Sequence, residues 1–135
     1  MIPKNLNKAF VQKIKMRKIA IVIAALLLAL GVLIFQPVPI SPEHKSNKIT
    51  GTVSYIFEGG VNDVVFRLKD TNQRFYINRG LEAGLEMQKL KDELIGNEVT
   101  IIYPKYWTPL DPKNSTKHLT ELRFNGDVIY SELGN

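Results

Sequence analysis

Histidine and cysteine, the side chains that most often bind transition metals, are scarce in this chain, which has two histidines and no cysteine. His44 lies in a polar stretch and His118 at the start of an apolar one, and neither has a second ligand at a regular spacing. Asp92 and Glu93 form a carboxylate pair, but adjacent residues on a helix point about 100° apart, which indicates a solvated face. We therefore expect no metal site and no cofactor.

Sequence motifs for nucleophilic catalysis and for phosphate binding are also missing. The chain has no G-x-S-x-G, no S-x-x-K, no P-loop and no G-x-G-x-x-G. Gly59-Gly60 stands alone, so it predicts a flexible hairpin loop rather than a phosphate cradle. The sequence predicts no catalytic residue and favours a binding protein over an enzyme.

Residues 103–112 are the most unusual stretch, because they contain two tyrosines, the only tryptophan and three prolines. Tyr106 and Trp107 lie at its centre. Rigid aromatic side chains supply contact area at low entropic cost, so we expect a stiffened binding edge here. The alternative interpretation is that Trp107 and Leu110 cap the open end of a small barrel.

A second candidate surface lies at the end of a predicted strand. Tyr76 and Asn78 should face away from the core, and Arg79 follows where the strand becomes a loop. Together they predict a polar recognition surface. The alternative for Arg79 is an internal salt bridge to Glu82 or Glu58.

Residues 19–35 contain no charge and no proline, and they run from Ile19 through Leu27 to Phe35. A helix of this length spans roughly 26 Å, slightly less than a bilayer core of about 30 Å. Pro37 then ends the helix. The run predicts a transmembrane helix that contacts the lipid bilayer.

Charge is distributed unevenly about this helix. Residues 1–18 hold six bases and no acid, whereas residues 36–135 hold the other 12 bases and all 13 acids. By the positive-inside rule, the basic tail stays in the cytoplasm and the C-terminal part is translocated. The pI of about 9.5 therefore reflects the tail, and it does not indicate nucleic-acid binding. The alternative is a signal peptide cleaved at residues 29–31.

The translocated part divides into a polar linker, 36–47, and one small domain, 48–135. Alternation of apolar and polar residues predicts strands, and a change to helical spacing predicts one helix. Asn125-Gly126 predicts a type I′ hairpin that sets Leu122 opposite Ile129. The expected elements are strands at 48–57, 64–69, 74–78, 99–103, 119–124 and 127–131, and a helix at 81–95 with Gly96 as its C-cap.

This order of elements, β-β-β-α-β-β, resembles the OB-fold, a Greek-key barrel with its helix between the third and fourth strands. The resemblance covers about residues 48–131 and includes the small residue Gly51 in the first strand. It implies a mainly β domain, an OB-like barrel of five to six strands, preceded by one transmembrane helix. The alternative is an open α+β sheet with the helix on one face.

The haem chaperones of cytochrome c maturation resemble this layout, with a basic N-terminus, one anchor and an OB barrel. Their haem-attachment motif pairs a histidine with a tyrosine four residues on. Here His118 is followed at that distance by Leu122, and His44 by Lys48. The resemblance therefore implies an architecture and no haem activity.

The resulting prediction is a membrane-tethered, extracytoplasmic binding module on the periplasmic side of a bacterial inner membrane. We expect it to hold a protein partner in or near the membrane, or a small ligand. One alternative is an accessory subunit that acts through its transmembrane helix, where Ala24 and Gly31 are small. Another is an enzyme without a familiar motif. The sequence does not indicate an oligomeric state.

Overall fold

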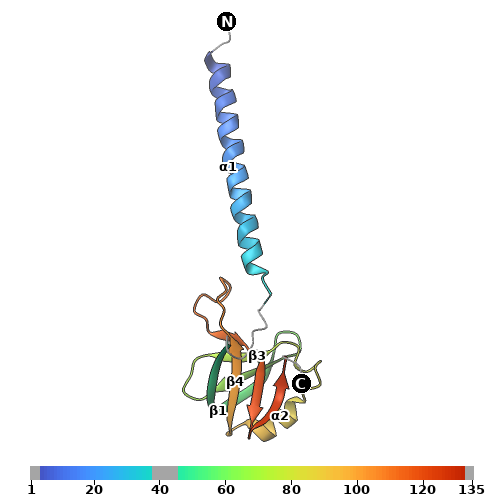
Figure 1. Ribbon diagram of the computed structural model, residues 1–135. Coiled ribbons are helices and arrows are strands. Elements are labelled where there is room, and N and C mark those ends of the chain that lie inside the picture. The colour runs from blue at the N-terminus through green and yellow to red at the C-terminus, as the bar shows by residue number, and fades with distance from the viewer. Residues whose placement is uncertain (1–3, 38–45, 133–135) are drawn as a thin grey trace. The chain divides into compact units, whose positions relative to one another are not determined.

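The N-terminal part of the protein is one long helix, α1 (Lys4–Ile34). The computed structural model describes residues 4–37 and 46–132 (Figure 1). The 31 residues of α1 rise about 46 Å, more than the thickness of a bilayer core. Asn7–Ile34 is long and apolar enough to cross a membrane, and no residue of its apolar window is buried. The predicted apolar helix is confirmed; a signal sequence would have the same length and composition.

α1 begins at Lys4, well before the predicted start at Ile19. No proline or glycine occurs between positions 4 and 30, so the basic segment continues the same helix. The helix ends as predicted, just before Pro37, and the Phe35 N–H still donates to the Gly31 carbonyl at 3.0 Å. The predicted linker, 36–47, lies largely outside the described residues.

The second part of the chain is a seven-stranded mixed sheet with one short helix. The strand order is β5-β3-β2-β1-β4-β6-β7, and the sheet is not closed. Among the strand pairs of residues 46–132, only β3 with β5 is parallel. The expectation of a mainly β domain with one helix is confirmed. The elements are β1 (Ser46–Gly59), β2 (Asp63–Leu68), β3 (Arg74–Ile77), α2 (Met87–Leu94), β4 (Glu98–Pro104), β5 (Thr116–His118), β6 (Glu121–Phe124) and β7 (Asp127–Ser131).

The long strand β1 is shared between two neighbours. Residues 46–52 pair with β4, and residues 53–59 pair with β2. The register shifts between Val53 and Tyr55, which is a bulge or irregularity of the strand. An extra residue reverses the faces, so Val53 and Ile56 are buried and Tyr55 is exposed. A regular alternation of faces along the predicted strand 48–57, which would place Tyr55 on the same face as Val53, therefore fails beyond Val53.

The predicted strand at 119–124 is confirmed only in its second part, as β6 (Glu121–Phe124), and an unpredicted strand, β5 (Thr116–His118), precedes it. β5 runs parallel to β3, and β6 runs antiparallel to β4. Only Leu119 and Thr120 separate them. The Leu119 N–H donates to the Tyr76 carbonyl at 2.8 Å, and the Thr120 N–H donates to the Ile102 carbonyl at 2.9 Å. This two-residue connection therefore hydrogen-bonds to β3 on one side of β1 and to β4 on the other side.

The β6–β7 hairpin turns at Asn125 and Gly126, as predicted. Both have positive φ, 52° and 88°, as a type I′ turn requires. Phe124 pairs with Asp127, but a register shift after Leu122 places that residue opposite Tyr130. The predicted pairing of Leu122 with Ile129 is therefore wrong. The residues of the turn determine its type, but they do not determine whether a bulge shifts the register farther along the strands.

The helix α2 is shorter than the predicted 81–95. Gly84 has a φ of +92°, so residues 78–84 form turns instead of helix. The Leu85 N–H donates to the Gly80 carbonyl at 3.1 Å, which closes this turn before α2 begins at Met87. Gly96 follows the helix with a φ of +84° and supports the predicted C-cap.

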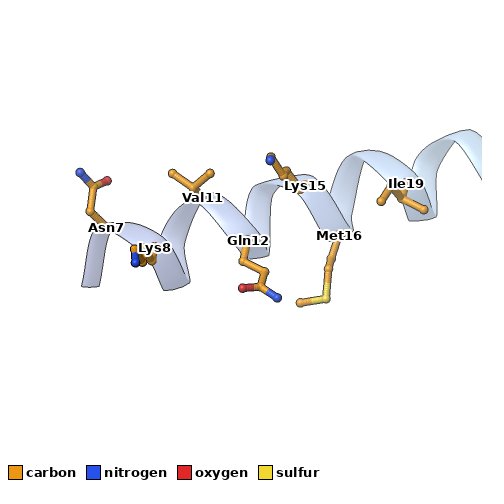
Figure 2. Close-up of a pocket in the computed structure, with 7 residues that line it drawn as sticks. All are labelled: Asn7, Lys8, Val11, Gln12, Lys15, Met16 and Ile19. Atoms are coloured by element: carbon orange, nitrogen blue, oxygen red, sulfur yellow. The ribbon is translucent and has the colours of Figure 1, made fainter. Parts of the chain in front are cut away.

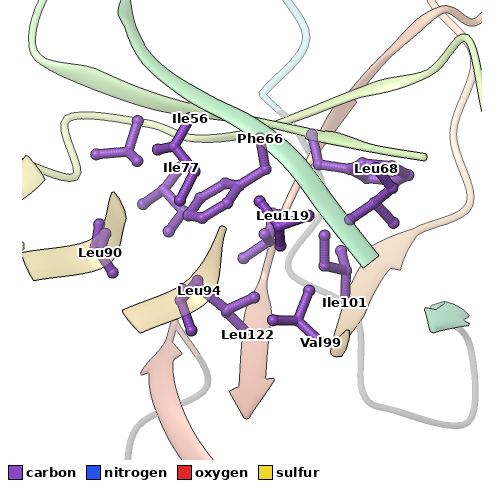
Figure 3. Packing of buried hydrophobic residues seen from close by; sticks show 13 residues of the cluster. Ile56, Phe66, Leu68, Ile77, Leu90, Leu94, Val99, Ile101, Leu119 and Leu122 are labelled. Atoms are coloured by element: carbon purple, nitrogen blue, oxygen red, sulfur yellow. The ribbon is translucent and has the colours of Figure 1, made fainter. Parts of the chain in front are cut away.

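One hydrophobic core lies between the sheet and α2 (Figure 3). Leu90 and Leu94 are the buried residues of α2, and they pack against side chains from the strands. Their helical spacing places both on the inner face of the helix. The other members of the core are Val53, Ile56, Val64, Phe66, Leu68, Phe75, Ile77, Val99, Ile101, Leu119 and Leu122.

Candidate functional site

A groove on the β1-β2-β3 side of the sheet is the candidate binding site. Strand register places Phe57, Val65 and Tyr76 next to one another across β1, β2 and β3. The groove has a volume of about 560 Å³, within the usual range for small-molecule sites. We call it the outer groove. Its lining residues are Phe57, Gly59, Gly60, Asp63, Val65, Arg74, Tyr76, Asn78, Tyr106, Thr108, Leu110, Asp111 and Thr116.

Tyr76 and Tyr106 meet in this groove from distant parts of the sequence. Burial raises the pKa of the Tyr76 hydroxyl, and Tyr106 raises it further through its charge and a hydrogen bond between the two side chains. Weaker contributions come from the carboxylates of Asp63 and Glu132. The Tyr76 hydroxyl is therefore neutral at physiological pH, and it can donate or accept a hydrogen bond.

The wall of the groove at Gly59 has no room for a side chain. A Cβ atom there would lie 2.7 Å from Val65 Cγ2, which is too close for two carbon atoms. Gly60 follows with a φ of +50°, and the β1–β2 connection turns there. Asp63 fixes the far side of the groove, because its Oδ1 accepts the Arg79 N–H at 2.8 Å.

Three of the five predicted surface residues line the outer groove: Tyr76, Asn78 and Tyr106. Trp107 is not part of its lining, and 61% of its surface is exposed. Arg79 does not line the groove either. It has a positive φ of 50° and pairs with Glu82 at 3.7 Å, which confirms the salt-bridge alternative.

The proposed capping role of Trp107 and Leu110 is wrong. Leu110 is 69% exposed, and neither residue belongs to the hydrophobic core. Both side chains therefore lie on the surface of the domain.

A polar network behind Tyr76 was not predicted from the sequence. The His118 ring packs edge-on against Tyr76, with ring centroids 5.2 Å apart. His118 Nε2 lies 2.9 Å from both carboxylate oxygens of Glu132, and the Tyr130 hydroxyl donates to the same carboxylate at 3.1 Å. Burial raises the pKa of Tyr130, and the neighbouring Glu132 adds to the increase. Through the His118 ring, this network packs against the Tyr76 side chain.

The only sequence signal for this network is weak. Tyr130 and Glu132 alternate with Ser131 at the end of the last strand, which indicates a shared face. Nothing in the sequence connects that face with His118, because the contact depends on the pairing of β6 with β7 and of β3 with β5. The network therefore becomes visible only in the folded structure.

The outer groove combines aromatic surface with a few polar groups. Phe57, Tyr76 and Tyr106 supply rings, and Asn78 and Arg74 supply hydrogen-bond donors. Such a surface suits stacking on a planar or apolar group with polar contacts at its edge. Among residues 4–37 and 46–132, no three His, Cys, Asp or Glu side chains come together as metal ligands.

A second hollow, on α1, is formed by one face of a single helix (Figure 2). Its residues recur at helical spacing, and nothing in the described part of the chain covers them. A concave ligand site needs walls from more than one element, so we do not interpret this hollow as a binding site. The residues are Asn7, Lys8, Val11, Gln12, Lys15, Met16 and Ile19.

Comparison with known proteins gives no family for this chain: no protein-family model matches it, and no curated protein matches it.

Proposed function

We propose that the protein is a membrane-tethered binding module whose outer groove receives a segment of a protein partner at the membrane. The observation that carries this proposal is the meeting of Tyr76, Asn78 and Tyr106 in one groove. Tyr76 lies in β3, Asn78 follows the end of that strand, and Tyr106 lies beyond β4. Buried aromatic residues with a polar rim are typical of interaction sites.

The anchor supports the membrane part of the proposal. α1 contains an apolar stretch long enough to cross a bilayer. All six bases of residues 1–18 lie on the N-terminal side of its uncharged part, residues 19–35. By the positive-inside rule, this distribution favours a cytoplasmic N-terminus and an extracytoplasmic domain, on the periplasmic side of a bacterial inner membrane.

We also infer that the domain is OB-like, since an OB-fold is a partly open Greek-key barrel. Its element order supports this inference, and so does the connection at Leu119 and Thr120. These two residues bond to β3 and to β4, which would otherwise be far apart in the strand order. In OB-folds the face of the second and third strands is the ligand face, and the outer groove lies there.

The test uses the full chain in detergent and measures recovery of the partner from solubilised native membranes. Tyr76→Ala with Tyr106→Ala should abolish recovery, because both rings form the groove. Trp107→Ala is the matched control, since it removes a neighbouring aromatic side chain outside the groove. Unchanged recovery with the groove variant, or equal loss in both variants, contradicts the proposal.

A second experiment separates the groove from an action of the transmembrane helix. Residues 19–35 are replaced by a leucine-rich helix of the same length, which removes the small residues Ala24 and Gly31. Partner recovery should be unchanged if the groove binds the partner. Loss of recovery with the replaced helix, and not with the groove variant, favours the accessory-subunit alternative.

A further inference from the structure

The loop between β4 and β5 exposes apolar and basic side chains together. Trp107 and Leu110 are 61% and 69% exposed, and neither belongs to the core. Lys105 and Lys113 flank them and are also exposed. We call residues 105–113 the tip loop; it projects beyond the end of β4 (Figure 1). A tryptophan and a leucine exposed beside lysines match the amphipathic character of a membrane interface.

The conformation of the tip loop is held by its own hydrogen bonds. The Asp111 N–H donates to the Thr108 carbonyl at 3.1 Å, and the Leu110 N–H donates to the Thr108 hydroxyl at 3.3 Å. The Asp111 carboxylate accepts the Thr116 N–H at 2.6 Å and the Ser115 hydroxyl at 2.9 Å. The loop therefore presents Leu110 on a fixed turn.

The register of the sheet places the tip loop beside the point where the chain enters the domain. Ser46, the first residue of β1, pairs with Pro104, the last residue of β4. The tip loop follows Pro104 directly. Residues 35–45 join α1 to this point, and a segment of eleven residues reaches at most about 40 Å. The tether therefore keeps the base of the tip loop within reach of the membrane surface if α1 is inserted.

We propose that the tip loop is a second membrane contact, in which Trp107 and Leu110 enter the headgroup region and the two lysines contact anionic phospholipids. The inference rests on the proposed insertion of α1. Each lysine near an anionic surface contributes about 1 kcal/mol, so its removal weakens the contact roughly fivefold. Tyr106 and Leu110 also line the outer groove. The membrane contact of the tip loop therefore fixes the orientation of the groove relative to the membrane surface.

Trp107 is the only tryptophan of the chain and reports on this contact directly. The full chain is reconstituted into vesicles of phosphatidylcholine with phosphatidylglycerol, and tryptophan emission is measured. We expect a blue-shifted emission, quenching by lipids brominated near the headgroup, and protection from acrylamide. Emission typical of water with full acrylamide quenching and no quenching by brominated lipids overturns the inference.

Charge variants identify the lipid. Lys105→Glu with Lys113→Glu should reduce quenching by brominated lipids in anionic vesicles. Lys69→Glu with Lys89→Glu is the matched control, because both residues are exposed, lie outside the tip loop and change the net charge equally. Equal quenching in the two double variants overturns the assignment of anionic headgroups.

A carbonate wash of the same vesicles separates the two proposals. Chain that is washed off contradicts the insertion of α1 and, with it, the tip-loop contact. Chain that stays bound while Trp107 remains in water overturns the tip-loop contact alone and leaves the anchor in place.

Discussion

The contact between Gly59 and Val65 gives a sharp test of how the outer groove is built. In Gly59→Ala, the new Cβ lies 2.7 Å from Val65 Cγ2, whereas carbon atoms pack at about 3.5–4.0 Å. Val65 is nearly buried, and a β-branched side chain on a strand turns away with difficulty. Overpacking of this kind costs about 1–3 kcal/mol, so we expect Gly59→Ala to lower the free energy of unfolding by about 2 kcal/mol.

Val65→Ala alone should also destabilise, by about 1.6 kcal/mol, because it removes two buried carbon groups. The double variant should be less destabilised than the sum of the two, since Val65→Ala makes room for the new methyl group. We expect this coupling to be about 1–2 kcal/mol, and urea unfolding of the full chain in detergent measures it. Effects that add within about 0.4 kcal/mol would refute the packing described at the groove wall.

Three further predictions concern stability. Because the pKa values of Tyr76 and Tyr130 are raised, the free energy of unfolding should fall as the pH rises above about 10, and Tyr130→Phe should reduce this pH dependence in urea unfolding. Hydrogen bonds from Ser115 and Thr116 lower the pKa of Asp111, so its contribution should be complete above about pH 4 and lost as the pH falls further; thermal unfolding of Asp111→Asn should lack this component. Gly126→Ala should cost about 1–2 kcal/mol by thermal unfolding, because position 126 has a φ of +88°, whereas an unaffected unfolding temperature would contradict the turn.

Features of the fold that depend on local chemistry were predictable from the sequence. The hairpin at Asn125-Gly126 follows from two positions that need positive φ, and the apolar helix ending before Pro37 follows from composition alone. The strand bulge after Val53 was not predictable, because a tyrosine such as Tyr55 occurs both in cores and on surfaces, so residue type alone does not decide which way it faces. Likewise, the turn at Gly84 delays the start of α2 to Met87, although the spacing of the leucines alone would begin the helix at position 81.

The candidate site was predictable only in part, for a similar reason. Alternation in the third strand places Tyr76 and Asn78 on the outer face. Their meeting with Tyr106 depends on long-range strand pairing, which local sequence does not encode. The same holds for Glu132, which reaches His118 across the sheet. The sequence places Trp107 next to Tyr106, but adjacent side chains in a loop need not face the same way, and only Tyr106 lines the outer groove.

The central claim is that the outer groove holds a protein partner at the membrane. A photo-crosslinking amino acid replaces Asn78, an exposed residue of the groove, in cells that produce the full chain. Lys89, an exposed residue of α2, is the control position. We predict one defined protein adduct from position 78, none from position 89, and loss of the adduct on Tyr106→Ala. The absence of an adduct at position 78, or the same adduct from both positions, would contradict the claim.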